Sequence, residues 1–173
     1  MEVTDTKGVT EIMIKLFRVD HRLLHGQVAV SWYGAVSADC ILIANDDVPK
    51  DPIRKASIKM AKPSGSKLVM QSIERSIESL NSGITDKYKL MIIVESINDA
   101  FRIISKMNHK PETLNLGGTK ETSKTRILAP SINVSAEDEK QLNKLIMQGV
   151  KVEVQQVSTS PIKVVKENDL STE

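Results

Sequence analysis

The chain has 173 residues, 24 basic and 22 acidic side chains, and a formal net charge of +2 at pH 7. This length suits one domain that buries most of the surface its unfolded form exposes. A dedicated nucleic-acid binder normally has a strongly basic face, which the balanced charge does not favour. An internal disulfide needs two cysteines, and the chain has only Cys40. No stretch reaches the roughly 18 to 20 apolar residues of a membrane-spanning helix, which predicts a chain that does not itself span a bilayer.

Residues 1–11 are polar and of mixed charge, without the basic start and apolar centre of a secretory signal. We therefore expect a disordered leader at 1–11, followed by a single domain at 12–173.

Beyond the leader, short apolar runs alternate with segments of helical periodicity. The predicted elements, in chain order, are a strand at 12–18, a helix at 26–36, a strand at 39–44, a helix at 52–61, a strand at 67–71, a helix at 72–83, a strand at 88–94, a helix from 96, a strand at 113–116, a helix from 135 to 149 and a strand at 150–157. Residues 126–129 fit either one more short strand or an extended loop. The tail after Pro161 fits an edge strand or a packed coil equally well.

Start signals support several of these helices. Asp51 before a proline is a favourable N-cap, and the spacing of Ile53, Ala56 and Met60 predicts that these three side chains face inward. Ser135 with Asp138 is typical of a capping box.

Strands that are apolar throughout and separated by amphipathic helices predict a doubly wound α/β domain. Its open sheet is mostly parallel, with helices on both faces and room for one antiparallel edge strand. Ligands bind such sheets beyond the carboxyl ends of the strands. The loops to examine for chemistry are therefore those at 19–25, 45–48, 95–96 and 117–119.

The first of these loops concentrates polar chemistry directly before a helix. Backbone N–H groups and the positive end of the helix dipole favour an anion at Gly26, and they favour the neutral, nucleophilic form of a histidine at His25. Arg22 can grip phosphate oxygens with two parallel hydrogen bonds. Asp20 is placed to orient Arg22 or a ring N–H, and Gln27 can donate to a phosphoryl group. A capping histidine without chemistry remains the alternative for His25.

Two further loops are candidates for phosphate binding. Asn45 and Asp46 end a strand beside the proposed site, where they either brace the active loop or form a plain Asx turn. Gly117 and Gly118 would let the backbone approach a phosphoryl group, although a glycine pair is more often only a turn.

Other histidines and the cysteine have simpler interpretations. His21 is expected to be a solvent-facing loop residue and His109 a surface residue, while Cys40 is expected in the core. Scattered histidines and one cysteine predict no metal site, and no dinucleotide or P-loop motif is present, so no cofactor is expected.

The loop sequence Asp20-His21-Arg22-Leu23-Leu24-His25-Gly26-Gln27-Val28 resembles the signature of the B component (EIIB) of mannose, fructose and sorbose family phosphotransferase systems. The likeness continues through Trp32, Asn45-Asp46, Asn115-Leu116-Gly117-Gly118 and the segment 149–157, and it covers nearly the whole chain from 12 to about 165. The family commonly has an acidic residue at the position of His21, so the alternative to a solvent-facing His21 is a residue that alters the local field or hydrogen bonding of the loop.

The resemblance implies a function for His25. In the family this histidine receives a phosphoryl group on Nδ1 from the A component and passes it to a sugar carried by the membrane C and D components. It implies a cytoplasmic protein peripherally associated with the permease, acting on sugars of the mannose, fructose, sorbose or N-acetylgalactosamine class. The reaction is that of a protein-N(pi)-phosphohistidine–sugar phosphotransferase. Homodimer formation stays open, and the rival hypothesis is a non-enzymatic α/β module that binds an anion or regulates a partner.

Overall fold

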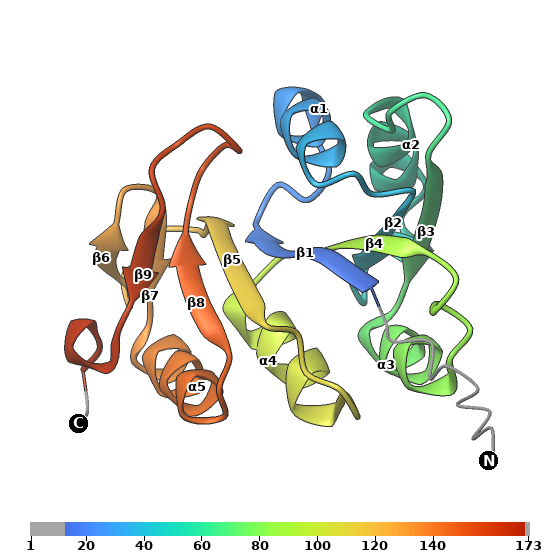
Figure 1. Cartoon of the computed structure of the whole chain (residues 1–173). Coiled ribbons are helices and arrows are strands. Elements are labelled where there is room, and N and C mark those ends of the chain that lie inside the picture. The colour runs from blue at the N-terminus through green and yellow to red at the C-terminus, as the bar shows by residue number, and fades with distance from the viewer. Residues whose placement is uncertain (1–12, 172–173) are drawn as a thin grey trace, which may run out of the picture.

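The computed structural model describes residues 13–171, apart from the side chains of Gln27 and Val28. Within this range one sheet contains β1 (Met13–Asp20), β2 (Cys40–Ala44), β3 (Lys67–Gln71), β4 (Lys89–Val94), β5 (Thr113–Gly118), β8 (Lys151–Val154) and β9 (Lys163–Val165). The strand order is β3-β2-β4-β1-β5-β8-β9, and only the pairing of the edge strand β9 with β8 is antiparallel (Figure 1). This arrangement confirms the predicted mostly parallel sheet. The tail after Pro161 forms an edge strand, which was one of its two interpretations. The expected leader lies outside the described residues.

Helices cover both faces of the sheet, as predicted. Helices α1 (Gly26–Ala35) and α2 (Pro52–Met60) lie on one face, and α3 (Ile73–Ser82), α4 (Ile97–Lys106) and α5 (Ala136–Met147) lie on the other (Figure 1). The chain also forms two short 3-10 turns, η1 (Val48–Lys50) and η2 (Glu167–Asp169). In the described part of the chain, no helix combines the length and apolar character needed to cross a membrane.

The sheet separates two apolar clusters, because successive side chains of a strand point to opposite faces. Phe17 and Val19 pack with α3, α4 and α5, whereas Leu16 packs with α1 and α2. β4 is buried from Leu90 to Val94, as expected of a strand covered on both sides. Cys40 is 2% exposed, which confirms it as a core residue, and burial raises the pKa of its thiol.

Local end signals are formed largely as predicted. The Asp51 carboxylate accepts hydrogen bonds from the N–H groups of Ile53 and Arg54 at the start of α2. Ser135 and Asp138 form a reciprocal capping box on α5. Gly83 ends α3 with φ of 85°, a left-handed conformation that a residue with a Cβ rarely adopts.

Residues 126–129, which fit either a short strand or an extended loop, form a strand. β6 (Arg126–Ala129) pairs with β7 (Ile132–Val134) in a separate antiparallel hairpin, and β7 was not predicted. Thr119 ties this hairpin to the end of β5, because its hydroxyl donates to the carbonyl of Asn133.

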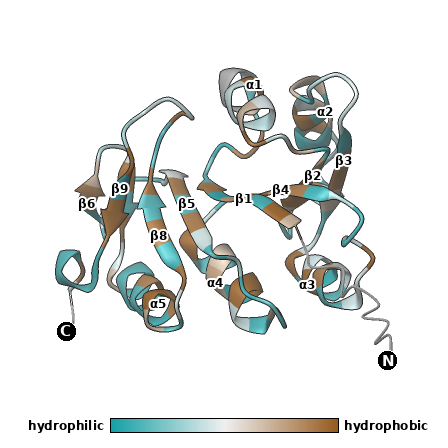
Figure 2. Ribbon diagram, viewed as in Figure 1, coloured by the Kyte–Doolittle hydropathy of each residue, from teal (hydrophilic) through white to brown (hydrophobic). Residues whose placement is uncertain are grey.

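The predicted orientation of α2 is wrong. Ile53 is 84% exposed and Met60 is 88% exposed, and Ala56 is exposed with them, whereas Ile58 packs into the core. Figure 2 shows hydrophobic and hydrophilic residues together on this helix. Periodicity identified an apolar stripe correctly, but the stripe faces outward because Ile58, opposite it, contacts the sheet.

Candidate functional site

The loop between β1 and α1 is a tight turn held by buried leucines. Leu23 has φ of 57°, an unusual value for a residue with a Cβ, and its N–H donates to the carbonyl of Asp20 at 2.9 Å. The side chains of Leu23 and Leu24 are 1% and 3% exposed in the apolar cluster under α1. Burial of these two side chains compensates the backbone strain and holds the following residue, His25, at the surface.

His25 is the N-cap residue of α1, with extended backbone angles and a half-buried side chain. Its ring Nδ1 lies 3.0 Å from the carbonyl oxygen of Leu23. Since a carbonyl oxygen can only accept, Nδ1 carries the proton in this arrangement, and a neutral ring holds its free electron pair on Nε2. Phosphorylation of Nδ1 would first require this hydrogen bond to break.

The start of α1 has the features of an anion site. The first N–H groups of a helix lack acceptors within the helix, and the His25 side chain makes no capping hydrogen bond to them. The first turn carries no acidic side chain that would neutralise the positive end of the dipole. A Cβ built on Gly26 would meet nothing within 4 Å, so open space adjoins the first helical residue. The structure does not describe the Gln27 side chain, so the phosphate contact expected of Gln27 stays a prediction.

Asp20 organises the loop through Arg22. Asp20 is fully buried, and its Oδ1 accepts from the backbone N–H of Arg22 at 3.1 Å and lies 3.6 Å from Nε of the same residue. The Arg22 side chain is 57% exposed. Of the two predicted roles for Asp20, orienting Arg22 or orienting a ring N–H, the contacts match the first.

Sequence reasoning missed Arg18, a buried arginine beneath this loop. Its guanidinium is 1% exposed and lies 3.4 Å from Oδ2 of Asp20, so Asp20 is held between two arginines. Burial lowers the pKa of Arg18, and the neighbouring Asp20 opposes that effect.

Arg18 also joins segments that are distant in sequence. Nη1 donates to Oδ1 of Asn115 at 2.6 Å and to the carbonyl of Gln155 at 2.8 Å, and Nη2 donates to the carbonyl of Gln156 at 2.7 Å. Its Cζ lies 5.0 Å from the ring centroid of Trp32 in α1, in cation–π geometry. Arg18 thus connects β1, β5, α1 and the segment after β8 under the His25 loop. A charged residue two positions before Asp20, within the buried run Leu16–Asp20 of β1, was the available signal.

The two glycines at the end of β5 contact protein groups. A Cβ on Gly117 would overlap the guanidinium of Arg18, so the missing side chain makes room for that arginine. The carbonyl of Gly118 accepts from the N–H of His21 at 3.0 Å. These contacts do not support a phosphate site at Gly117, whose role there stays a prediction.

His21 is less exposed than expected. The side chain is half-buried, and its Nδ1 lies 3.3 Å from the position of a Cβ built on Gly118. That nitrogen is buried and has no hydrogen-bond partner within the described residues. The expectation of a solvent-facing residue is wrong because the turn folds the ring back against β5. His109, in contrast, is exposed as predicted.

Asn45 and Asp46 make their contacts on the other side of β4. Oδ1 of Asn45 accepts from the N–H groups of Asp47 and Val48, which is the Asx turn that formed one of its two interpretations. Asp46 accepts from the N–H of Ile73 at the start of α3 and pairs with Arg102. Neither is among the hydrogen-bond partners of Arg22, and a phosphate-binding role for them stays a prediction.

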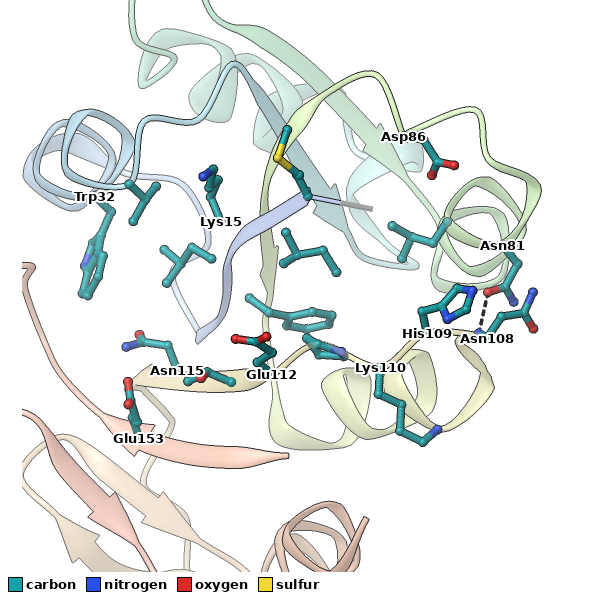
Figure 3. A pocket seen from close by; sticks show the side chains of 18 of the residues that line it. Lys15, Trp32, Asn81, Asp86, Asn108, His109, Lys110, Glu112, Asn115 and Glu153 are labelled. Carbon is teal, nitrogen blue, oxygen red and sulfur yellow. Dashed lines mark hydrogen bonds between the residues drawn. The ribbon is translucent and has the colours of Figure 1, made fainter. Parts of the chain in front are cut away.

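A groove of about 840 Å³ lies between the amino-terminal parts of β1 and β5 (Figure 3). The two strands pair only from Arg18 and Asn115 onward, so their earlier residues diverge. Asn115 and Trp32 line the groove and contact Arg18, but Asp20, Arg22 and His25 do not line it. His25, which is half-buried, therefore lies outside this groove.

Comparison with known proteins gives a consistent result. Residues 14–169 match the model of the family described as PTS system sorbose subfamily IIB component. A probable phosphotransferase enzyme IIB component of Streptococcus pyogenes is 42% identical over 91 residues, a match that spans 53% of this chain and 56% of that relative. The N-acetylgalactosamine-specific phosphotransferase enzyme IIB component 2 of Escherichia coli is 30% identical, covering 86% of this chain and 93% of the relative.

Solved structures agree with the fold. The crystal structure of the IIBSor domain of the sorbose permease from Klebsiella pneumoniae superimposes with a TM-score of 0.82 at 26% identity. The match covers 91% of this chain and 95% of that domain.

Proposed function

Because the chain belongs to the sorbose subfamily of IIB components of sugar phosphotransferase systems, in the wider mannose, fructose and sorbose family, we propose that His25 is its phosphoryl carrier. The observation that carries this proposal is the position of His25. His25 is the N-cap residue of α1, two residues after Leu23, and is half-buried. Its side chain leaves the first N–H groups of the helix uncapped. The phosphoryl donor is the A component, and the acceptor is a sugar presented by the membrane C and D components.

The chemistry is two successive in-line transfers. In the first, the hydrogen bond from Nδ1 of His25 to the Leu23 carbonyl breaks and the ring proton moves to Nε2, so that Nδ1 holds the free electron pair. Nδ1 then attacks the phosphorus of a phosphohistidine on the A component and a new N–P bond forms. The donor nitrogen keeps the electron pair of the bond that breaks, the His25 ring gives up a proton and the donor imidazole takes one up. In the second, a sugar hydroxyl attacks that phosphorus, the N–P bond of His25 breaks and the hydroxyl proton is released. Such transfers depend mainly on positioning and on stabilising the charge of the phosphoryl oxygens.

The loop residues supply that positioning. Arg22, which is held at its Nε by Asp20 and is largely exposed, is the mobile charge that reaches the phosphoryl oxygens. The N–H groups at the start of α1 donate to the same oxygens, and Gly26 leaves space for them. Asp20 orients Arg22. This scheme requires no nucleotide, metal or other cofactor.

We also propose the setting of this reaction. The chain acts in the cytoplasm, peripherally associated with the permease, on a sugar of the mannose, fructose, sorbose or N-acetylgalactosamine class. Support comes from the family and from the sugars in the names of its relatives.

Phosphorylation in vitro tests the proposal. Incubation with phosphoenolpyruvate, the upstream phosphocarriers and the A component is expected to add one acid-labile phosphate, measured by intact-protein mass spectrometry. The His25→Ala variant should lose the label, whereas His21→Ala and His109→Ala should keep it. Nitrogen-15 NMR of the labelled protein should place the phosphate on Nδ1. An unlabelled wild-type chain in a reaction that labels the A component would instead favour a non-enzymatic anion-binding module.

A further inference from the structure

The outward face of α2 has an unusual composition. We define this α2 face by four exposed residues, Ile53, Ala56, Lys59 and Met60. Its two large apolar side chains are almost fully exposed and lie seven residues apart, so they share one stripe about 10 Å long. Single exposed apolar residues are common, and contiguous exposed apolar patches mark interaction sites, so this aligned pair is a candidate centre for such a surface. Within the described residues, nothing packs on this stripe.

The charge around this stripe is one-sided. Residues 50–62 contain five basic side chains and one acidic side chain, Asp51. The Asp51 carboxylate is engaged by the N–H groups at the start of α2, and Arg54 is paired with Glu95 at 3.4 Å. Lys50, Lys59 and Lys62 are exposed, and Nζ of Lys62 donates to the carbonyl of Ser66 at 2.7 Å. A partner that fits this surface needs an apolar centre and acidic side chains around it.

The α2 face adjoins the surface that a phosphoryl donor must cover. β1 and β2 run parallel with β4 between them, so α1 and α2 both begin at the edge of the sheet where His25 lies. Two strand spacings separate the ends of β1 and β2 by about 10 Å. A protein interface of standard size covers about 800 Å² on each partner, which corresponds to a radius of roughly 16 Å. An interface of this size centred on His25 is therefore wide enough to reach the first turn of α2, where Ile53 lies.

We propose that the α2 face docks the A component, with Ile53 and Met60 as apolar anchors and Lys59 as a contact for an acidic side chain. This inference rests on the proposed function, because it names the surface by which the donor of that reaction is recognised. It also accounts for the outward orientation of α2. The stripe that the helix would ordinarily bury against its own sheet is presented to a second protein, while Ile58 and the C-cap residue Ala61 pack against the core.

Binding measured without phosphotransfer tests this surface directly. In a His25→Ala background, calorimetry with the unphosphorylated A component encoded with this chain should show at least tenfold weaker binding for Ile53→Asp and Met60→Asp. Lys59→Glu should weaken binding at least threefold and reduce its salt dependence. Matched controls on the opposite face are Met147→Asp, at a position 73% exposed, and Lys140→Glu, also at an exposed position. Both should bind within twofold of the parent, and circular dichroism should show that every variant is folded.

Kinetics provide a second readout in the chain that retains His25. The α2 face does not include the phosphoryl acceptor, so its variants should raise KM for the phosphorylated A component and leave kcat unchanged. Unchanged Kd and KM in all three variants would overturn the docking surface even if His25 is phosphorylated. If His25 is never phosphorylated, the proposed function fails, but selective loss of A-component binding would still support the surface.

A membrane is the alternative occupant that the experiment can detect. The same variants should bind vesicles of phosphatidylcholine with 30% phosphatidylglycerol no differently from the controls. Loss of vesicle binding in the α2 variants, with A-component binding intact, would overturn the proposal in favour of a lipid-binding face.

Discussion

The guanidinium of Arg18 occupies the space that a side chain on Gly117 would fill. The two residues lie on the adjacent strands β1 and β5, directly beneath the loop that carries His25. Through this packing, the glycine at 117 permits the buried arginine, and the buried arginine neutralises Asp20. The order of the His25 loop thus depends on a glycine about ninety residues away in the sequence.

The variant Gly117→Ala tests this relationship. Its methyl group must displace Arg18 from Asn115 and Asp20, so we expect a loss of about 2–4 kcal/mol in the free energy of unfolding. Phosphorylation of His25 should slow as well, because Asp20 loses its buried partner. Urea unfolding and the phosphorylation rate measure the two effects. Gly34→Ala, in open space on α1, is the control and should be neutral or stabilising by up to about 1 kcal/mol. Equal stability of the two variants would contradict the packing argument.

Conservative replacement of Arg18 separates its charge from its geometry. Lysine at this position keeps a positive charge but lacks the planar guanidinium fork. That fork reaches the side chains of Asp20 and Asn115 and the backbone carbonyls of Gln155 and Gln156. Arg18→Lys should therefore lower stability by about 2–4 kcal/mol and slow phosphorylation at a temperature where the variant is folded. Arg126→Lys is the control, because Arg126 pairs with the buried Glu139 elsewhere in the fold. It should affect stability alone. A wild-type phosphorylation rate in folded Arg18→Lys would argue against a positioning role.

Unlike replacement of Arg18, replacement of Arg22 should affect the rate of phosphotransfer and leave stability nearly unchanged. Its side chain is 57% exposed, so Arg22→Ala should change the unfolding free energy by no more than about 1 kcal/mol. The loss of a charge that acts on the phosphoryl oxygens should slow transfer by about a hundredfold or more. Rapid-quench phosphorylation kinetics measure the rate, and Arg75→Ala, at an exposed position on α3, is the matched control. A rate equal to that control would remove Arg22 from the proposed site.

The pH dependence of stability should identify Asp46 as a structural residue. The N–H of Ile73, against the opposing effect of burial, lowers the pKa of Asp46, and Arg102 adds to the lowering. A pKa that is lower in the folded state means that ionised Asp46 stabilises the fold above the unfolded value near 4. That contribution is lost as the pH falls through the folded value.

Thermal melts of Asp46→Ala across pH measure this effect. The Asp46 side chain is 48% exposed and its charge is screened by solvent, so the variant should be less stable than wild type by no more than about 1 kcal/mol at pH 7. The difference should shrink as the pH falls below the unfolded pKa and through the lower folded pKa. Asp47→Ala, at an exposed neighbouring position, is the control. Phosphorylation should be unchanged in both variants. Slower phosphotransfer in Asp46→Ala would instead support the phosphate-binding role predicted from the sequence.

Local patterns predicted much of the fold. The strand at 67–71 begins and ends where expected, and Ser72, Gly83 and the Ser135–Asp138 pair mark helix ends as expected. These features involve neighbours within a few residues, so their energetics are encoded locally. β7 was missed because a three-residue strand is stabilised by its partner strand and has no periodicity of its own.

The sequence by itself determined the α/β class, the family and the loop in which His25 precedes a helix, because each is encoded in local patterns and motifs that can be read in order along the chain. Only the tertiary structure decided that Arg18 is buried between Asn115 and the carbonyl of Gln155, which are 97 and 137 residues away. It also decided that α2 turns Ile53 and Met60 outward. Periodicity shows which side chains share a face of a helix, but whether that face meets the protein's own sheet or a partner depends on how distant segments fill the available space.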